Sequence, residues 1–429
     1  MGMEKSLHQY LAPGLLLAYL LALPASHAFE LHPWLPPPFL VLAGFILLAL
    51  FTTAGGGSIS VGPLLRYDLW LWCGLLWITL ATAVNVLLAE GRVEPKQAMH
   101  LASYWGVIVV YYYGLRALLG AARWSATTVL KWAALVYLAV CALALLEMSL
   151  KTYWGVDFDA YIPRVGDDEE YFPLQGGSVI RPRALTSESG NLALYLELLG
   201  PVIVGHLWVS GQKRLAFATA AAGIVALVAT FSAAGLVALG AAYAIGVLFA
   251  ARWSMQRLRL LVLCSCVPAV LFFLLYFLVS PDLLESIWLK LTFIDPASAG
   301  DRLDRWQAAW ALIAERPLLG VGAGGFLEQF QLDYGIVSWW IQLAVEAGLP
   351  GVVFFALFFL SAMRSALRRN IGHPGYFVSI AAAAIHYMAI SDYWLPWLWF
   401  VLALLAQPLR GAQPEAKSWQ QANLRFSSS

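Results

Sequence analysis

The sequence predicts an all-α protein that spans a membrane about twelve times. Of its 429 residues, 61% are hydrophobic and only 12% are charged, whereas about a quarter of the residues of a soluble domain are charged. The apolar residues gather in runs of about 20, the length of a helix that crosses the hydrocarbon core of a bilayer. We therefore expect one membrane domain over residues 1–429.

Twelve apolar segments account for the predicted spans. They are residues 9–29, 34–53, 64–89, 99–120, 125–149, 189–209, 213–231, 233–251, 257–279, 338–363, 374–391 and 393–410. Two longer and more polar segments, 150–187 and 280–337, lie between groups of spans, and a polar tail covers 411–429. Lys5 and the apolar run after it also fit a secretory signal, but we interpret this run as the first span of a polytopic protein.

Basic residues predict which side of the membrane each loop faces. With the N-terminus in the cytoplasm and twelve alternating spans, 14 of the 26 basic residues fall at cytoplasmic ends, where Glu4 and Glu415 are the clear loop acids. These bases are Lys5, Arg116, Arg123, Lys213, Arg214, Arg252, Arg257, Arg259, Arg364, Arg368, Arg369, Arg410, Lys417 and Arg425. The excess obeys the positive-inside rule. We therefore expect 150–187 and 280–337 to be large periplasmic loops, 411–429 to be a cytoplasmic tail, and both termini to be cytoplasmic.

Charge and motifs exclude two classes of partner. A net charge of +1 gives no case for binding nucleic acid. The glycines of "GVGAGGF", residues 320–326, are not followed by the lysine of a nucleotide-binding loop. An enzyme acting on the outer face has no nucleotide-linked donor to use, so we expect its donor to arrive already activated on a lipid carrier in the same bilayer.

The stretch "RPRALTSESGNLALYLELLG", residues 181–200, places charges at the mouth of an apolar segment. Ionisable groups are costly in lipid and are usually retained for function. Thr186 or Ser187 is the predicted N-cap of the helix, which would put Glu188, Asn191 and Tyr195 on one helix face.

Arg181 and Arg183 would then lie beside the N-terminus of that helix. Arginines together with free helical N–H groups make an anion site suited to a diphosphate, and Glu188 is positioned to take a proton from a sugar hydroxyl. A purely structural alternative stays open, because acids in the first turn complement the helix dipole and arginines at a membrane boundary can anchor in headgroups.

The second long loop predicts a helix lying in the membrane interface. In "GDRLDRWQAAWALIAERPLLGVGAGGF", residues 300–326, one apolar stripe is formed by Leu303, Trp306, Trp310 and Ile313. Arg302 and Arg305 lie off this stripe, facing headgroups or a lipid diphosphate, unless the helix is a passive membrane-lying element. Pro317 ends the helix, and the glycines after it predict a tight turn. Further on, Gln342 and Glu346 share a helix face and can hydrogen-bond each other, although Glu346 fits a packing role equally well.

Three stretches in this order resemble the O-antigen ligase and O-antigen polymerase superfamily of bacterial envelope enzymes. They are "RPRALTSESGNLALYL", "DRLDRWQAAWALIAERPLLGVGAGGF" and "IQLAVEAGLPG". The resemblance implies a GT-C-like inverting transferase of the inner membrane that moves a glycan from an undecaprenyl-diphosphate carrier without nucleotide, metal or other cofactor. It also implies that Arg181 or Arg183, with Arg302 and Arg305, binds the diphosphate.

Two departures from the ligase pattern favour the polymerase branch of this superfamily. Ligases carry a His-Asn pair at the positions of Val337 and Ser338, and Ser-Arg-Gly where this chain has Ser232 followed by two alanines. "RALTSESGNLA" instead resembles the Arg…Glu-x-Ser pattern of polysaccharide polymerases, so Glu188 is the first candidate base. His386, six residues before Asp392, is the second, unless it is a helix-packing histidine.

The sequence therefore predicts a polysaccharide polymerase that joins lipid-linked repeat units. Glu188 and His386 are its candidate catalytic residues, and five residues are expected to bind acceptor or to support the site: Asn191, Tyr195, Gln342, Glu346 and Asp392. The alternatives are a ligase whose acceptor is lipid A core or a protein, and a transporter of lipid-linked glycans. The expected partners are the lipid-linked oligosaccharide, the acceptor glycan, membrane lipids and a chain-length regulator.

Overall fold

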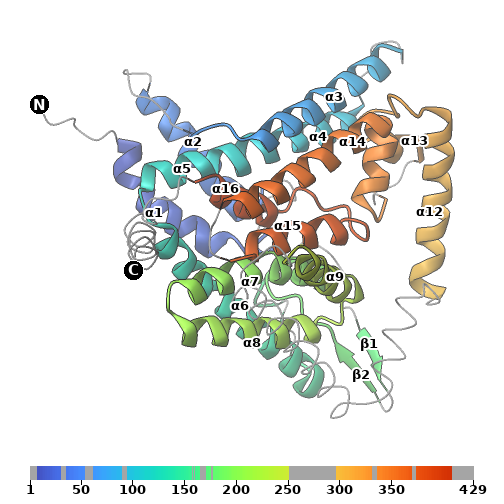
Figure 1. Ribbon diagram of the computed structural model, residues 1–429. Coiled ribbons are helices and arrows are strands. Elements are labelled where there is room, and N and C mark those ends of the chain that lie inside the picture. The colour runs from blue at the N-terminus through green and yellow to red at the C-terminus, as the bar shows by residue number, and fades with distance from the viewer. Residues whose placement is uncertain are drawn as a thin grey trace, which may run out of the picture.

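The fold is α-helical apart from one short hairpin in the part of the chain that the computed structural model describes (Figure 1). The described residues are 7–29, 35–53, 61–88, 94–156, 158, 160–164, 171–174, 177–250, 296–330, 336–369 and 373–407. The ninth predicted span, 257–279, and the predicted tail, 411–429, lie outside them.

The helices match the predicted spans closely. The first group comprises α1 (Leu7–Ala22), α2 (Pro37–Thr53), α3 (Arg66–Leu88), α4 (Pro95–Gly106), the π-helical η1 (Val107–Gly114), α5 (Leu115–Ala122) and α6 (Ala126–Trp154). After the antiparallel hairpin of β1 (Tyr171–Leu174) and β2 (Gly177–Ile180) come α7 (Ser189–Val209), α8 (Lys213–Ala229), α9 (Ala233–Ala250), α12 (Pro296–Glu315), α13 (Gly325–Phe330), α14 (Trp339–Arg368), α15 (Gly375–His386) and α16 (Pro396–Ala406).

Five helical stretches of the described chain are long and apolar enough to cross a membrane. They are α3, the continuous stretch Pro95–Ala122, α6, α7 and α14. Shorter apolar helices accompany them, namely α1, α2, most of α9, α15 and α16. The chain is therefore an integral membrane protein of the all-α class.

Local contacts set where several helices end. In α6, the side chain of Ser125 accepts a hydrogen bond from the Thr128 N–H at the first turn, and Gly155 ends the helix in a left-handed conformation, φ 63°. α15 ends at His386, earlier than the predicted 391, because the N–H of Trp339 binds the carbonyls of Tyr387 and Ile390 at 2.9 and 2.8 Å. The segment between α15 and α16 therefore packs as an irregular chain against the start of α14.

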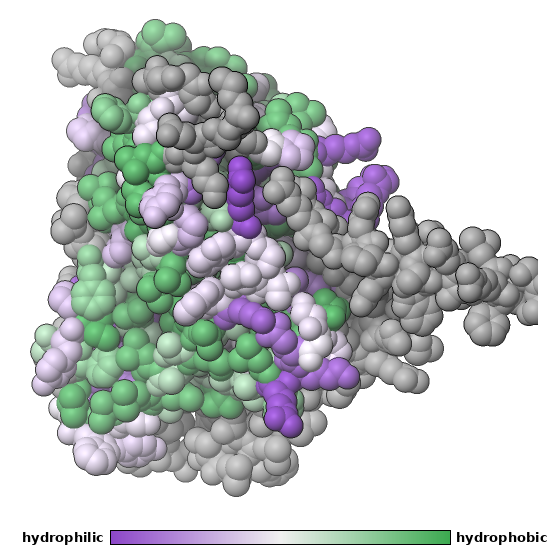
Figure 2. Space-filling view, turned by 90° about the vertical axis from the view of Figure 1, so that its left-hand side faces the viewer, coloured by the Kyte–Doolittle hydropathy of each residue, from purple (hydrophilic) through white to green (hydrophobic). Residues whose placement is uncertain are grey.

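One end of the bundle carries a group of exposed basic residues. α5 ends, α6 begins and α7 meets α8 at this end, which is the one that Figure 2 faces. Its exposed bases include Arg123, Lys213, Arg214, Arg364 and Arg368, and hydrophilic side chains stand there beside apolar ones (Figure 2). We call this the basic end, and the opposite end, where α6 ends and α7 begins, the site end.

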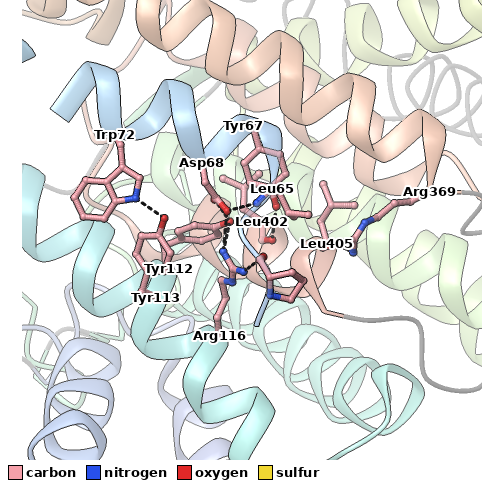
Figure 3. A network of polar contacts seen from close by, with 11 residues as sticks. Leu65, Tyr67, Asp68, Trp72, Tyr112, Tyr113, Arg116, Arg369, Leu402 and Leu405 are labelled. Atoms are coloured by element: carbon pink, nitrogen blue, oxygen red, sulfur yellow. Dashed lines mark hydrogen bonds and ion pairs between the residues drawn. The ribbon is translucent and has the colours of Figure 1, made fainter. Parts of the chain in front are cut away.

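Arg116, predicted at a cytoplasmic end of a span, is buried inside the basic end (Figure 3). Its guanidinium donates to the Asp68 carboxylate at 3.1 Å and to the Pro63 carbonyl at 2.5 Å. The Tyr112 hydroxyl donates to the same carboxylate at 2.6 Å. This network joins α3 to η1 and α5. Removing either charged side chain would leave the other charge buried and unpaired.

Arg369 joins the same end of the molecule to α16 (Figure 3). Its guanidinium donates to the carbonyls of Leu405 and, at 2.9 Å, Gln407. These carbonyls belong to the last turn of α16, where no intrahelical N–H remains to bind them. Arg116 and Arg369 therefore both have structural partners.

α12 runs across the site end rather than along the bundle, as a helix in the interface plane would (Figure 1). Its predicted apolar stripe is divided between two environments. Leu303 and Trp310 are 46% and 57% exposed, whereas Ile313 is buried with Ala309 and Leu312 against the start of α14. The helix thus packs one edge on the protein and presents another outward.

Candidate functional site

Glu147 holds the segment that precedes α7. It is fully buried near the end of α6, and its Oε2 accepts the backbone N–H groups of Arg183 and Ala184 at 3.1 and 2.6 Å. Its Oε1 accepts from Arg164 at 2.9 Å and lies 3.6 Å from the Lys151 Nζ. The carboxylate therefore fixes the backbone of the arginine segment, including Ala184 at φ 49°.

Sequence reasoning missed Glu147. A signal was present, because an acid near the end of an apolar helix, four residues before Lys151, is expensive unless it is paired. The partner segment, however, lies 36 residues further along the chain.

The two arginines are held in different directions. Arg183 is buried, and its Nη1 donates to the Ser187 carbonyl at 3.1 Å. Arg181 is partly exposed, and its Nε donates to the Thr230 carbonyl, at the turn between α8 and α9, at 2.8 Å. Arg181 thereby ties the N-terminus of α7 to the α8–α9 turn.

The N-cap of α7 is Glu188, not Thr186 or Ser187 as predicted. Glu188 has extended backbone angles, φ −142° and ψ 164°, and the helix begins at Ser189. The Thr186 hydroxyl is used in the turn, where it donates to the carbonyls of Arg183 and Glu188 at 2.8 Å. Glu188 consequently lies at the mouth of the helix, partly exposed.

The predicted common face of Glu188, Asn191 and Tyr195 stays a prediction, and the last two side chains have different surroundings. Asn191 does point toward the helix N-terminus and donates to the Ser187 hydroxyl at 2.8 Å. Tyr195 is buried between aromatic rings, with centroid distances of 5.8 Å to Tyr137 and 5.4 Å to Trp397. Its place is in the helix packing.

His386 pairs with an acid that sequence reasoning did not select. Its Nδ1 lies 2.6 Å from Oε1 of Glu197 on α7, and both side chains are fully buried. The structure therefore gives His386 a partner across the bundle, which is the helix-packing role considered as its alternative. An acid in the middle of an apolar span was the available signal for Glu197.

Asp392 lies near both Asn191 and His386. Burial raises the pKa of Asp392 from 3.8 to about 6, while the hydrogen bond from Asn191 and the charge of His386 oppose that rise. A polar series thus leads from Asn191 at the mouth of α7, past Asp392, to the buried His386–Glu197 pair.

Glu346 joins three elements through one buried carboxylate. Its Oε1 accepts the Gly324 N–H and the Gln342 side chain, each at 3.0 Å, which confirms the predicted Gln342–Glu346 hydrogen bond. Its Oε2 accepts the Tyr104 hydroxyl at 3.0 Å, and His100 Nδ1 lies 3.3 Å from Oε1. Glu346 is buried and fully engaged in packing.

The glycine-rich turn fits a kink in α14. Pro350 has no N–H, which leaves the Glu346 carbonyl without its helical donor, and that carbonyl accepts the Gly322 N–H at 3.0 Å. The Leu349 N–H leaves the helix to bind Pro317 O at 2.8 Å. The two stretches "PLLGVGAGGF" and "EAGLPG" therefore form one structural unit.

Close approach explains the glycines of this unit. Gly320 and Gly348 have φ of 60° and 66°, and a Cβ on Gly320 would collide with the carbonyl oxygen of Val345. Asn85 binds the same turn, donating to Gly320 O at 3.2 Å and accepting from Arg316 at 3.0 Å.

The arginines of α12 are described only in part. Arg305 is partly exposed, and the side chain of Arg302 lies outside the described residues. α12 and the β1–β2 hairpin lie on the same side of the molecule (Figure 1). Contact of these arginines with Arg181 or Arg183 stays a prediction.

The architecture defines a polytopic helical membrane protein with a charged, partly exposed site at one end of its bundle. Residues 218–356 match the model of a protein family described as O-antigen ligase. This match, over about a third of the chain, confirms the resemblance to the O-antigen ligase and polymerase superfamily, a family of glycosyl-transferring enzymes. No curated protein matches the chain. The match includes α12, the glycine-rich turn and the first half of α14, whereas Arg181, Arg183 and Glu188 precede it.

Proposed function

We propose that this protein is a polysaccharide polymerase of the bacterial inner membrane. It would transfer a glycan from an undecaprenyl-diphosphate carrier to a hydroxyl of a second lipid-linked repeat unit. The observation that carries the proposal is the mouth of α7, where Arg181, Arg183 and the partly exposed Glu188 lie within eight residues of one another. The α8–α9 turn binds the Arg181 side chain, and Glu147 binds the backbone of Arg183.

The diphosphate of the donor binds at this mouth. Arginine side chains and the N–H groups of a helix N-terminus both favour a phosphate, and Arg302 and Arg305 of α12 complete the site in this proposal. Negative charge grows on the diphosphate as it leaves, so cations that already surround it stabilise the transition state more than the ground state.

Glu188 acts as the general base. Its carboxylate takes the proton of the acceptor hydroxyl while the hydroxyl oxygen bonds to the anomeric carbon. The bond from that carbon to the diphosphate oxygen breaks on the opposite face, and undecaprenyl diphosphate leaves with the electron pair. Attack opposite the leaving group inverts the anomeric centre, and the step uses neither a metal nor a cofactor.

His386 has a supporting role in this mechanism. Its Nδ1 is engaged by Glu197 and its ring is buried, whereas Glu188 is partly exposed. Asn191 and Asp392 link the His386–Glu197 pair to the mouth of α7, and Glu346 with Gln342 holds the glycine-rich turn.

The proposed topology has twelve spans in a GT-C-like arrangement, with the site end facing the periplasm and both termini in the cytoplasm. The exposed arginines and lysines at the basic end support this orientation through the positive-inside rule.

A ligase is the second candidate. The description of the matched family favours it, and its acceptor would be lipid A core or a protein. Val337 and Ser338 at the positions of the ligase His-Asn pair favour the polymerase.

Glu188→Gln tests the proposed base. The purified variant in liposomes, given a lipid-linked repeat unit, is expected to form polymer at least about 100-fold more slowly than the unchanged protein, the usual scale of general-base catalysis. Glu315→Gln, at an exposed acid of α12, is the matched control and should retain the rate. An unchanged rate for Glu188→Gln would remove Glu188 from this role.

A further inference from the structure

A groove of about 170 Å³ lies between α6, α7, α8 and α9. Gly200 on α7 and Ala220 and Gly223 on α8 are among its lining residues, and its walls are almost entirely apolar. The two glycines leave room for the Tyr137 side chain, which a Cβ at either position would meet. Tyr137 of α6 forms one wall, where its hydroxyl donates to the Leu196 carbonyl at 3.2 Å. An apolar cavity of about 150 Å³ is large enough to bind benzene, so this groove has room for a hydrocarbon of comparable volume.

The groove leads toward the arginines of the site. It follows α8 from Ala216 to Leu227, about 17 Å at a rise of about 1.5 Å per residue. The Leu227 carbonyl accepts from the Thr230 hydroxyl at 2.6 Å, and the Thr230 carbonyl accepts from Arg181 at 2.8 Å. One helical turn therefore separates the upper end of the groove from Arg181.

Several lining residues on α8 are exposed at the surface of the bundle. Phe217, on its wall, is 67% exposed, and Ala220 and Ile224 are partly exposed. A hydrocarbon chain can therefore enter sideways from the lipid, with no need to pass the polar mouth of α7.

We propose that this groove holds the first isoprene units of the polyprenyl tail while the attached diphosphate lies at Arg181. This inference rests on the proposed function, because it takes the donor to be a polyprenyl diphosphate. A cationic rim next to an apolar groove matches one molecule that has an anionic head and a long hydrocarbon tail, as a polyprenyl diphosphate does. Neither half of the feature alone would select such a ligand.

The benefit of the groove is orientation rather than hydrophobic transfer. The tail is already in lipid, so moving it into an apolar groove gains packing contacts only. A tail fixed beside α7 and α8 holds the diphosphate at the arginines in one direction, and such positioning lowers the barrier of the transfer step.

Photolabelling with a diazirine on the second isoprene unit of undecaprenyl diphosphate tests this site without requiring any turnover. In liposomes, the unchanged full-length protein is expected to carry label on α7 and α8, within 196–208 and 216–227. Excess unlabelled undecaprenyl diphosphate should compete for the label, and phosphatidylglycerol should not.

Ala220→Trp is the decisive variant, because it fills the groove from a partly exposed position. Loss of about ten carbon contacts at 0.1–0.2 kcal/mol each should raise the concentration for half-maximal labelling about tenfold. Ala218→Trp is the matched control, since Ala218 is exposed on the same helix and is not among the lining residues. It should label as the unchanged protein does.

Three results would overturn the proposal: label on other helices, equal competition by phosphatidylglycerol, or equal labelling of the two tryptophan variants. The polymerase function is tested separately, by a gel of the glycan products that the protein forms in liposomes. Correct labelling without polymer would keep the tail site and reject the reaction.

Discussion

The carboxylate of Glu346 offers the sharpest test of the structural account, because the superfamily resemblance includes this residue and the structure gives it a packing role. Three donors converge on it at 3.0 Å, from Gly324, Gln342 and Tyr104. In Glu346→Ala all three lose their acceptor inside the protein. A buried donor without a partner costs about 1–3 kcal/mol, and loss of one member of a buried charged network costs about 3–5 kcal/mol.

We therefore expect Glu346→Ala to lose about 3–5 kcal/mol of stability. Glu346→Gln keeps one carbonyl oxygen for the Gly324 N–H and should lose about 1–3 kcal/mol. The assay is the apparent melting temperature in detergent, together with hydrogen exchange of residues 320–325. Exchange there should rise in the same order, because Glu346 holds this turn to α14.

Glu315→Gln serves again as the control and should melt as the unchanged protein does. A Glu346→Ala variant with unchanged melting temperature and turn protection, but no transfer activity, would refute this reasoning. Glu346 would then act on the substrate instead of on the fold.

Two further predictions concern the site end. Glu147→Ala should lower stability by about 3–5 kcal/mol and abolish polymer formation, because Arg164 and the backbone of Arg183 lose their shared acceptor. The melting temperature measures the loss of stability, and the product yield measures the loss of polymer. Glu147→Gln should be intermediate in both measurements. Asp392→Asn should change how stability depends on pH. Burial raises the pKa of Asp392 to about 6, so the folded state binds this proton more tightly than the unfolded state. The resulting stability is present at pH 4 and is lost as the pH rises toward 7. The asparagine variant should escape that loss, worth up to about 3 kcal/mol, and equal pH profiles for the two proteins would contradict the assignment.

Hydropathy and local motifs predicted much of this fold. A membrane-spanning helix needs about 20 consecutive apolar residues, so helices such as α3 and α7 could be placed from local sequence alone. The Gln342–Glu346 hydrogen bond was equally accessible, because residues four apart share a helix face. The end of α15 at His386 could not be predicted from local sequence, because it depends on the distant Trp339. The N–H of Trp339 binds carbonyls of the residues that follow His386.

The partners of buried charges could not be read from local sequence. Glu147 binds Arg183, and Glu197 binds His386 across 189 positions of the chain. Arg116 was predicted at a cytoplasmic end of a span, but its buried partner Asp68 lies 48 positions earlier in the chain. Each acid was visible as a costly group in an apolar helix, but its partner depends on which helices pack together.

The most direct test of the proposed reaction is a product gel from the purified full-length protein in liposomes, with a lipid-linked oligosaccharide repeat as the sole glycan. We expect a ladder of lengthening lipid-linked glycans, formed without lipid A core. If no product forms until lipid A core is added, and one larger product then appears, the polymerase proposal is contradicted and the protein is a ligase.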